Sequence, residues 1–120
     1  MPSTILVVDD EPGIRTMVQF ELSQQGYDIV TADSGVRALD VLAERSVDMV
    51  LTDMRMPHMD GLDLVIHVRK TRPTLPIVLM TGFVEERVQK VQEYNLSATL
   101  QKPFTIDQLS EVIRRILPVS

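Results

Sequence analysis

The sequence predicts an α/β fold, namely a single doubly wound sheet of five parallel strands with five helices in a three-layer αβα arrangement. Short apolar, β-branched runs recur along the 120 residues, as expected of strands that are covered on both faces. Between these runs lie stretches of roughly ten to fifteen residues with apolar side chains at helical spacing. This alternation is the signature of right-handed βαβ units, and its length fits one domain spanning residues 1–120.

The first 45 residues predict two strands and two helices. Residues 5–8 are continuously apolar and form the first strand. Pro12 opens the first helix, because its fixed backbone angle suits a first helical turn, and Gly26 ends it. Residues 27–32 are shorter and more mixed, which suits a strand at or near an edge of the sheet. Ser34 is the expected start of the second helix.

The middle of the chain predicts two further strands that end on polar residues. Residues 49–52 form a strand that leads into Asp53. After a loop, Asp60 is expected to cap the third helix. Residues 77–80 form the fourth strand, which ends at Thr81.

The last third of the chain predicts a weak helix, a short strand and a strongly signalled helix. Residues 84–91 carry a sparse apolar stripe in a polar-rich segment, which is the fourth helix. Residues 98–101 form a fifth strand that is closed by Lys102. Thr105 and Gln108 have the spacing of a capping box for the final helix.

Polar side chains follow the strands at their carboxyl ends, where ligands bind in open parallel sheets. Asp9 and Asp10 follow the first strand, Asp53 ends the third, and Thr81 and Lys102 end the fourth and fifth. Buried carboxylates are costly without a partner, so three acids together suggest a divalent cation. Their oxygen donors favour Mg²⁺ over zinc. A metal beside a free carboxylate in turn suggests phosphoryl chemistry.

Composition excludes several other classes of protein. The chain has no cysteine, which excludes a disulfide scaffold and a zinc-thiolate site and fits the cytoplasm. It has no basic leader and no run of about 20 apolar residues, so we expect no membrane insertion. Its net charge of −5 opposes direct nucleic-acid binding. We interpret His58 and His67 as surface residues, and Met54, Met56 and Met59 as loop packing rather than copper ligands.

Four motifs, VVDDE, LTDMRMPHMDG, LMTG and LQKPF, each follow or end a predicted strand. Together they resemble the receiver domain of two-component response regulators, and the resemblance covers the whole chain. It implies the flavodoxin-like strand order 2-1-3-4-5. It also implies that Asp53 accepts a phosphoryl group from a sensor histidine kinase or a phosphotransfer protein.

The resemblance assigns roles around Asp53. It implies that Asp10 binds Mg²⁺ directly, that Asp9 acts mostly through water, and that the backbone carbonyl of Arg55 supplies another oxygen. Thr81 would donate a hydrogen bond to one phosphoryl oxygen, and Lys102 would pair with another. These groups would neutralise the charge that develops on the transferred phosphoryl group.

Four further positions carry expectations from the same resemblance. Gly82 keeps the approach to the site open, and the Lys102-Pro103 peptide bond is expected to be cis. Arg55 and Phe83 occupy the two positions that flank the path of the hydrolytic water in receivers. Because both side chains are large, we expect a long-lived acyl phosphate.

Thr99 stands where receivers usually carry the aromatic residue of their switch. Since its small side chain cannot fill the space of a ring, we expect the conformational change in the loop after the fourth strand and in residues 84–93. The output surface should still be formed by the fourth helix, the fifth strand and the fifth helix. No output domain is expected within this chain, so the partner is a downstream effector or an output domain linked in a longer parent protein.

Three alternative functions compete with a phosphorylation switch. Flavin binding needs a phosphate loop rich in Ser, Thr or Gly after the first strand, where this chain has acids. An aspartyl-phosphate hydrolase needs a second acid at the position of Arg55. A receiver-like docking module that works without phosphorylation is the remaining alternative, because Thr99 departs from the usual switch pattern.

Overall fold

Five parallel strands form one sheet in the order β2-β1-β3-β4-β5. The computed structural model describes residues 2–82 and 94–119. The strands are β1 (Thr4–Val8), β2 (Asp28–Ala32), β3 (Met49–Asp53), β4 (Ile77–Thr81) and β5 (Ala98–Gln101). The order confirms the one that the resemblance implied, and β2 lies at an edge as its mixed sequence predicted.

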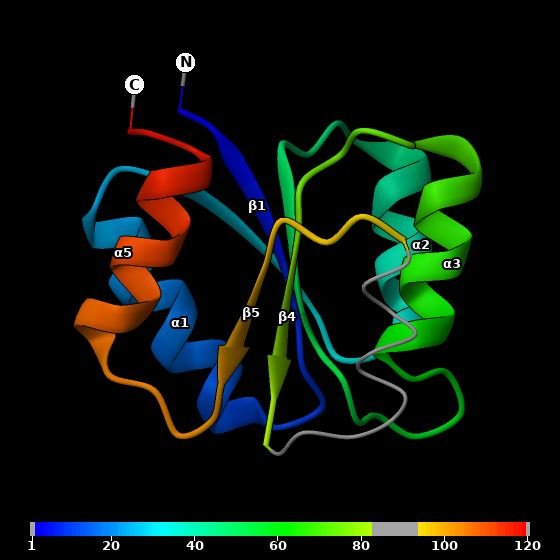
Figure 1. Cartoon of the computed structure of the whole chain (residues 1–120), viewed down its shortest axis with the longest axis horizontal. Helices are drawn as coiled ribbons and strands as arrows, with labels where there is room; N and C mark the ends of the chain where they lie inside the picture. Colours follow the sequence, from blue (N-terminus) through cyan, green and yellow to red (C-terminus); the bar gives the residue numbers. More distant parts are fainter. Residues whose placement is uncertain (1, 83–93, 120) are drawn as a thin grey trace.

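Helices cover both faces of this sheet. The described helices are α1 (Pro12–Gln24), α2 (Gly35–Glu44), α3 (Gly61–Thr71) and α5 (Ile106–Ile116). Figure 1 shows α1 and α5 on one face and α2 and α3 on the other, which confirms the three-layer architecture. The helix predicted at residues 84–91 lies outside the described residues.

The helix starts follow the predicted capping residues in three of these four helices. The side chains of Ser34, Asp60 and Thr105 accept hydrogen bonds from the backbone at the starts of α2, α3 and α5. Asp60 and Thr105 form full capping boxes, which satisfy N–H groups that a helix start leaves unpaired. By contrast, α1 begins at Pro12 without a side-chain cap from Glu11.

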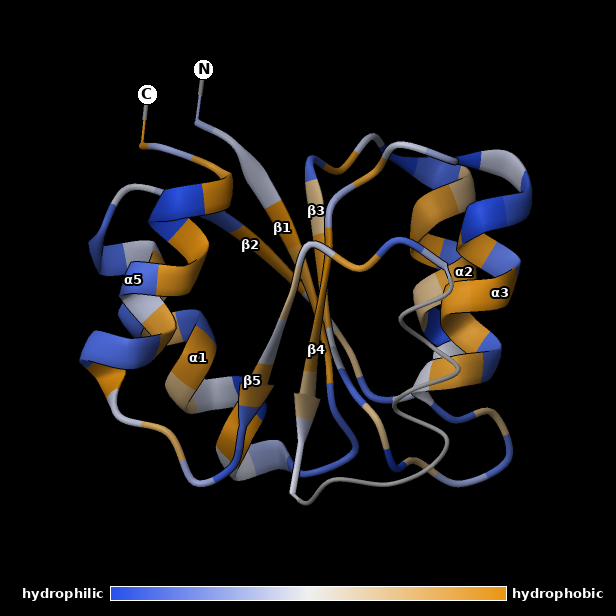
Figure 2. Ribbon diagram, in the orientation of Figure 1, coloured by the Kyte–Doolittle hydropathy of each residue, from blue (hydrophilic) through white to orange (hydrophobic). Residues whose placement is uncertain are grey.

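Two apolar clusters hold the strands in place, one on each face of the sheet. Successive strand residues point to opposite faces, so Leu6 and Val8 pack under α2 and α3 while Ile5 and Val7 pack under α1 and α5. Figure 2 shows apolar residues along the strands and on the helices that cover them. Burial on both faces explains why these strands read as continuous apolar runs.

The methionines and histidines after β3 behave as predicted. Met54 and Met56 are buried in the cluster under α2 and α3, and Met59 packs against Gly35. His58 and His67 are exposed.

Arg69 fastens α3 to the chain before β5. Its guanidinium donates to the carbonyl oxygens of Tyr94 (2.7 Å), Arg72 (2.9 Å), Leu75 (2.7 Å) and Asn95 (3.0 Å). Burial lowers the pKa of this guanidinium. The segment that precedes β5 is thereby tied to the last turn of α3.

The last described residues are held against the turn between α1 and β2. The Tyr27 hydroxyl donates to the carbonyl oxygen of Leu117 at 2.5 Å, and Val119 lies over Gly26. Figure 1 shows both chain ends on one side of the molecule, opposite the carboxyl ends of the strands. Within the described ranges, no helix has the length and apolar character needed to cross a membrane.

Candidate functional site

The polar residues predicted at the strand ends lie along one edge of the sheet. Asp53 ends β3 and Thr81 ends β4, while Asp9 and Lys102 directly follow β1 and β5. The parallel register pairs Asp53 with Met80 and Thr81 with Gln101, so these ends are neighbours. The edge therefore gathers acids, a hydroxyl and an ammonium from four strands.

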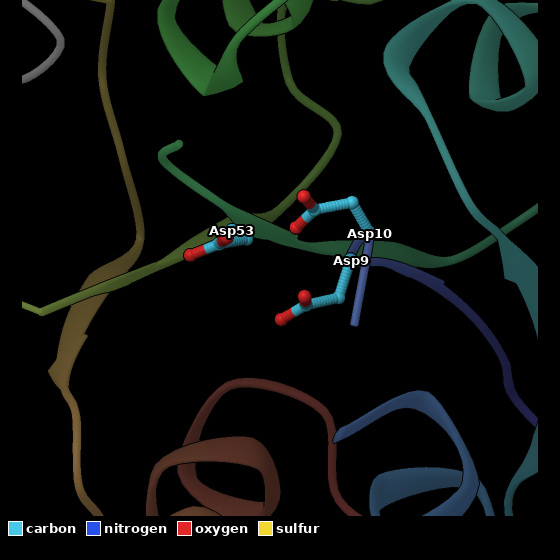
Figure 3. A group of neighbouring side chains, drawn as sticks. All are labelled: Asp9, Asp10 and Asp53. Atoms are coloured by element: carbon cyan, nitrogen blue, oxygen red, sulfur yellow. The ribbon is translucent and has the colours of Figure 1, made fainter. Parts of the chain in front are cut away.

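Three carboxylates converge at this edge. One oxygen atom each from Asp9, Asp10 and Asp53 can be chosen so that all lie within 4.8 Å of one another. Figure 3 shows Asp9 and Asp10 reaching from the turn after β1 towards the side where Asp53 lies. Asp9 is fully buried and Asp53 is 6% exposed, whereas Asp10 is exposed. One of the three carboxylates is therefore accessible to solvent, and the other two are buried.

Lys102 joins two of these acids. Its Nζ atom lies 2.9 Å from Asp9 Oδ2 and 3.2 Å from Asp53 Oδ1. Its backbone N–H donates to the carbonyl oxygen of Thr81 at 2.7 Å, which ties the end of β5 to the end of β4. The Lys102-Pro103 peptide bond is cis, and the side chain reaches Asp53, as predicted.

Burial and charge shift two pKa values in the site. Burial raises the pKa of Asp53, the neighbouring charge of Asp9 raises it further, and Lys102 opposes both effects. Burial alone would lower the pKa of Lys102, but its hydrogen bonds and charge interactions with Asp9 and Asp53 outweigh this and raise it. The Lys102 ammonium therefore stays charged beside the two carboxylates that it contacts.

Gly61 lies against the backbone of Asp53 and Met54, a contact that the sequence does not predict. A Cβ atom at Gly61 would lie 2.6 Å from the carbonyl oxygen of Asp53 and 2.9 Å from Cα of Met54. The Gly61 N–H donates to the carbonyl oxygen of Met54 at 2.8 Å. The start of α3 therefore rests directly on the backbone that carries Asp53, which only glycine permits.

Arg15 is a second residue that the sequence analysis missed. Its Nη1 atom donates to the carbonyl oxygen of Asp9 at 2.7 Å from within α1. The sequence offered one signal for such a contact. Arg15 is a cation in the first turn of a helix, where cations are unfavourable, and that turn has no acidic residue.

The roles expected of the remaining predicted residues stay predictions. Arg55 is exposed in the loop after β3, and Thr99 is exposed on β5. Gly82 is exposed, and a Cβ atom there would have no described heavy atom within 4 Å. Phe83 lies outside the described residues.

The donor set fits a hard divalent cation. The three clustered side chains offer carboxylate oxygens, which Mg²⁺, Ca²⁺ and Mn²⁺ prefer, and one of these carboxylates is accessible to a hydrated ion. A cation there would lie beside the Asp53 carboxylate, with an ammonium also in contact with it. That arrangement can stabilise negative charge added to Asp53.

Comparison with known proteins gives consistent matches. Residues 5–114 match the family described as the response regulator receiver domain. The chain is 31% identical over 120 residues to Sporulation initiation phosphotransferase F of Bacillus subtilis, covering 99% of this chain and 97% of that protein. It is 36% identical over 114 residues to the transcriptional regulatory protein GlrR of Escherichia coli, covering 93% of this chain. It spans about a quarter of GlrR, 26%.

A solved structure matches at the level of the whole fold. The response regulator protein TrrA of Thermotoga maritima, in complex with Mg²⁺ and BeF, superposes with a TM-score of 0.88 at 34% identity. The superposition covers 96% of this chain and 99% of that one.

Proposed function

This chain belongs to the response regulator receiver domain family, and we propose that it is a signalling switch that accepts a phosphoryl group on Asp53. The observation that carries the proposal is the contact of the Asp53 carboxylate with Lys102, beside the acids Asp9 and Asp10. An ordinary turn acid would not be buried among two other acids and an ammonium.

The proposed reaction is a phosphoryl transfer from a phosphohistidine on a sensor histidine kinase or a phosphotransfer protein. An Asp53 carboxylate oxygen forms the new bond to phosphorus, the bond from phosphorus to the imidazole nitrogen breaks, and that nitrogen keeps the electron pair. An acyl phosphate on Asp53 results. The contribution of the protein is mostly positioning and charge stabilisation, because the transfer itself needs little further chemistry from side chains.

Each residue of the site has a part in this proposal. Lys102, already in contact with Asp53, pairs with a phosphoryl oxygen, and the Thr81 hydroxyl donates to another. Asp9, Asp10, Asp53 and the carbonyl oxygen of Arg55 would hold Mg²⁺, which supplies charge neutralisation at the phosphoryl oxygens when bound. The similarity to a receiver solved with Mg²⁺ and BeF supports this choice of metal.

Arg55 and Phe83 govern the lifetime of the acyl phosphate in our proposal. Neither side chain is a small or acidic group that would orient an attacking water, and both are bulky. We therefore propose slow autodephosphorylation and a long-lived signal. The domain acts as a phosphoacceptor rather than as an enzyme with a separate substrate.

The proposed partners are proteins. A sensor kinase or phosphotransfer protein acts upstream, and an effector or a linked output domain acts downstream, as the name of GlrR suggests for that relative. We place the domain in the cytoplasm, where such kinases have their phosphohistidine. The net charge of −5 disfavours nucleic acid as a direct partner.

A docking module that works without phosphorylation is the second candidate function. It is favoured by Thr99, which is small and exposed on β5 where the family usually carries its switch aromatic. Both candidates share the fold, so only a phosphorylation-dependent change separates them.

Mass spectrometry after incubation with acetyl phosphate and Mg²⁺ tests the phosphoacceptor. We expect the wild-type mass to increase by one phosphoryl group, and this increase to be absent from Asp53→Asn. Asp107→Asn, a change at an exposed acid in the first turn of α5, is the matched control and should be modified like the wild type. A wild type that gains no mass, or an Asp53→Asn variant that does, would contradict the proposal.

Amide exchange with and without beryllofluoride distinguishes the switch from the docking module. We expect protection to change mainly in residues 82–93, because Thr99 cannot support an aromatic switch. Changes spread evenly over the domain, or none in residues 82–93, would favour the docking module.

A further inference from the structure

The turn between β1 and α1 is fixed through Asp9. Its N–H donates to the carbonyl oxygen of Ala32 at 3.2 Å, and its Oδ1 accepts from the N–H of Glu11 at 2.9 Å. Its carbonyl oxygen accepts from Nη1 of Arg15 at 2.7 Å. Asp10 lies between Asp9 and Glu11, so bonds on either side of it constrain its backbone.

Arg15 occupies a position that is unfavourable for a cation by helix electrostatics alone. It is the fourth residue of α1, near the positive end of the helix dipole, where anions are preferred. Among the described helices, α1 is also the one whose first residues have no side-chain cap. The bond from the Arg15 side chain to the carbonyl oxygen of Asp9 links the start of α1 to the residue that follows β1.

We infer that Arg15 is a positioning residue for the cation site, whose guanidinium holds the β1–α1 turn so that Asp10 faces Asp53. The inference rests on the proposed function, since it assigns a role in Mg²⁺ binding. Arg15 itself is not a ligand. It acts through the backbone of Asp9, as groups behind a metal site commonly orient the ligands in front of them.

Removing Arg15 has two opposing effects on cation affinity. Loss of its positive charge, which lies beside the backbone of Asp9, would strengthen the attraction of the site for Mg²⁺. Loss of the hydrogen bond would release the turn, so that Asp10 must be ordered when the metal binds, which weakens affinity. A positioning role predicts that the second effect is larger, and the sign of the change therefore decides the question.

Metal affinity measured on matched variants tests the inference. Mn²⁺, which shares the oxygen preference of Mg²⁺, serves as the probe by electron paramagnetic resonance, with Mg²⁺ competition giving the Kd for Mg²⁺. We expect Arg15→Met to weaken binding by about tenfold. Arg15→Lys, which keeps the charge and can reach one acceptor, should lie between Arg15→Met and the wild type.

Arg37→Met is the charge control. Arg37 lies in the first turn of α2, and within the described part of the chain its side chain makes no hydrogen bond to Asp9. The Arg37→Met variant should bind Mg²⁺ as tightly as the wild type or slightly more tightly. Phosphorylation by acetyl phosphate supplies a second readout, because Arg15→Met should approach the wild-type rate at saturating Mg²⁺ if positioning is its role.

Three outcomes overturn the inference while leaving the proposed function standing. Arg15→Met binding Mg²⁺ as tightly as the wild type or more tightly would show that the charge, not the bond, matters. A rate that stays low at saturating Mg²⁺ would place the defect elsewhere. If Arg15→Met proves unfolded by urea titration, Arg15→Lys decides, and unaltered affinity in that variant overturns the role. A wild type that binds no Mg²⁺ would instead defeat the proposed function together with this inference.

Discussion

Replacing Gly61 with alanine should destabilise the domain and disturb Asp53 together. The added Cβ atom would meet two backbone atoms, at 2.6 Å and 2.9 Å, and neither can move without shifting the end of β3. Overpacking of this kind costs about 1–3 kcal/mol. The better helix propensity of alanine offsets at most about 1 kcal/mol of it. We expect a net loss of about 1–2 kcal/mol in the free energy of unfolding.

Two other glycines calibrate this estimate. A Cβ atom at Gly35 would lie 2.7 Å from Sδ of Met59, a flexible side chain that can move aside, so Gly35→Ala should cost less than Gly61→Ala. A Cβ atom at Gly13 would have no described neighbour within 4 Å, so Gly13→Ala should stabilise α1 by about 0.5 kcal/mol.

Urea unfolding of the three variants, with phosphorylation by acetyl phosphate, provides the assay. Stability should fall in the order Gly13→Ala, wild type, Gly35→Ala, Gly61→Ala. Because the proposed transfer needs Asp53 in line with the donor, Gly61→Ala should also be phosphorylated about tenfold more slowly. A Gly61→Ala variant with wild-type stability and rate would refute the reasoning that Gly61 sets the position of Asp53.

Four further predictions follow from the site. Mg²⁺ at ten times its Kd should stabilise the domain by about 1.4 kcal/mol, measured as a higher Tm. Asp10→Asn should lose most of this increase. A Tm that does not change with Mg²⁺ would contradict the metal site. Because the pKa of Asp53 is raised, the folded state keeps its proton longer than the unfolded state, so wild-type stability relative to Asp53→Asn should fall as pH rises from 3.8 through the raised pKa. Urea titrations across that range should show this slope, and the opposite slope would argue against burial of the carboxylate. Lys102→Met leaves two buried carboxylates without their ammonium and should lower the free energy of unfolding by about 1–3 kcal/mol at pH 7, and by less in acid. Unchanged stability would show that the contact contributes nothing. Arg55→Asn combined with Phe83→Ala should shorten the acyl phosphate lifetime, followed by loss of the added mass, and an equal lifetime would dismiss the steric explanation.

The strands and their polar ends were predictable because both signals are local. A run such as residues 5–8 has no polar face, so it must be covered on both sides, and the acids that follow it must lie at the sheet edge. Local patterns also identified Asp60 and Thr105 as helix caps, because the capping residue and its partner lie three positions apart.

The supports of the site were not predictable because they depend on how separate segments approach. Gly61 is critical only because α3 begins against the backbone of Asp53, and nothing in the loop sequence fixes that distance. The different exposure of Asp9 and Asp10 also appears only in the folded chain. Because the two residues are identical and adjacent, the sequence alone does not indicate which of them is buried.

The hydrogen bond from Tyr27 to Leu117 has a practical consequence for experiments on this domain. Both chain ends leave the molecule at the amino edge of the sheet, while Asp53 lies at the far edge, about 17 Å away for a five-residue strand. A fluorophore, affinity tag or surface tether at either end therefore leaves the face around Asp53 free for a kinase to approach. Immobilised through either end, the domain would present the edge that carries Asp53 to the solution.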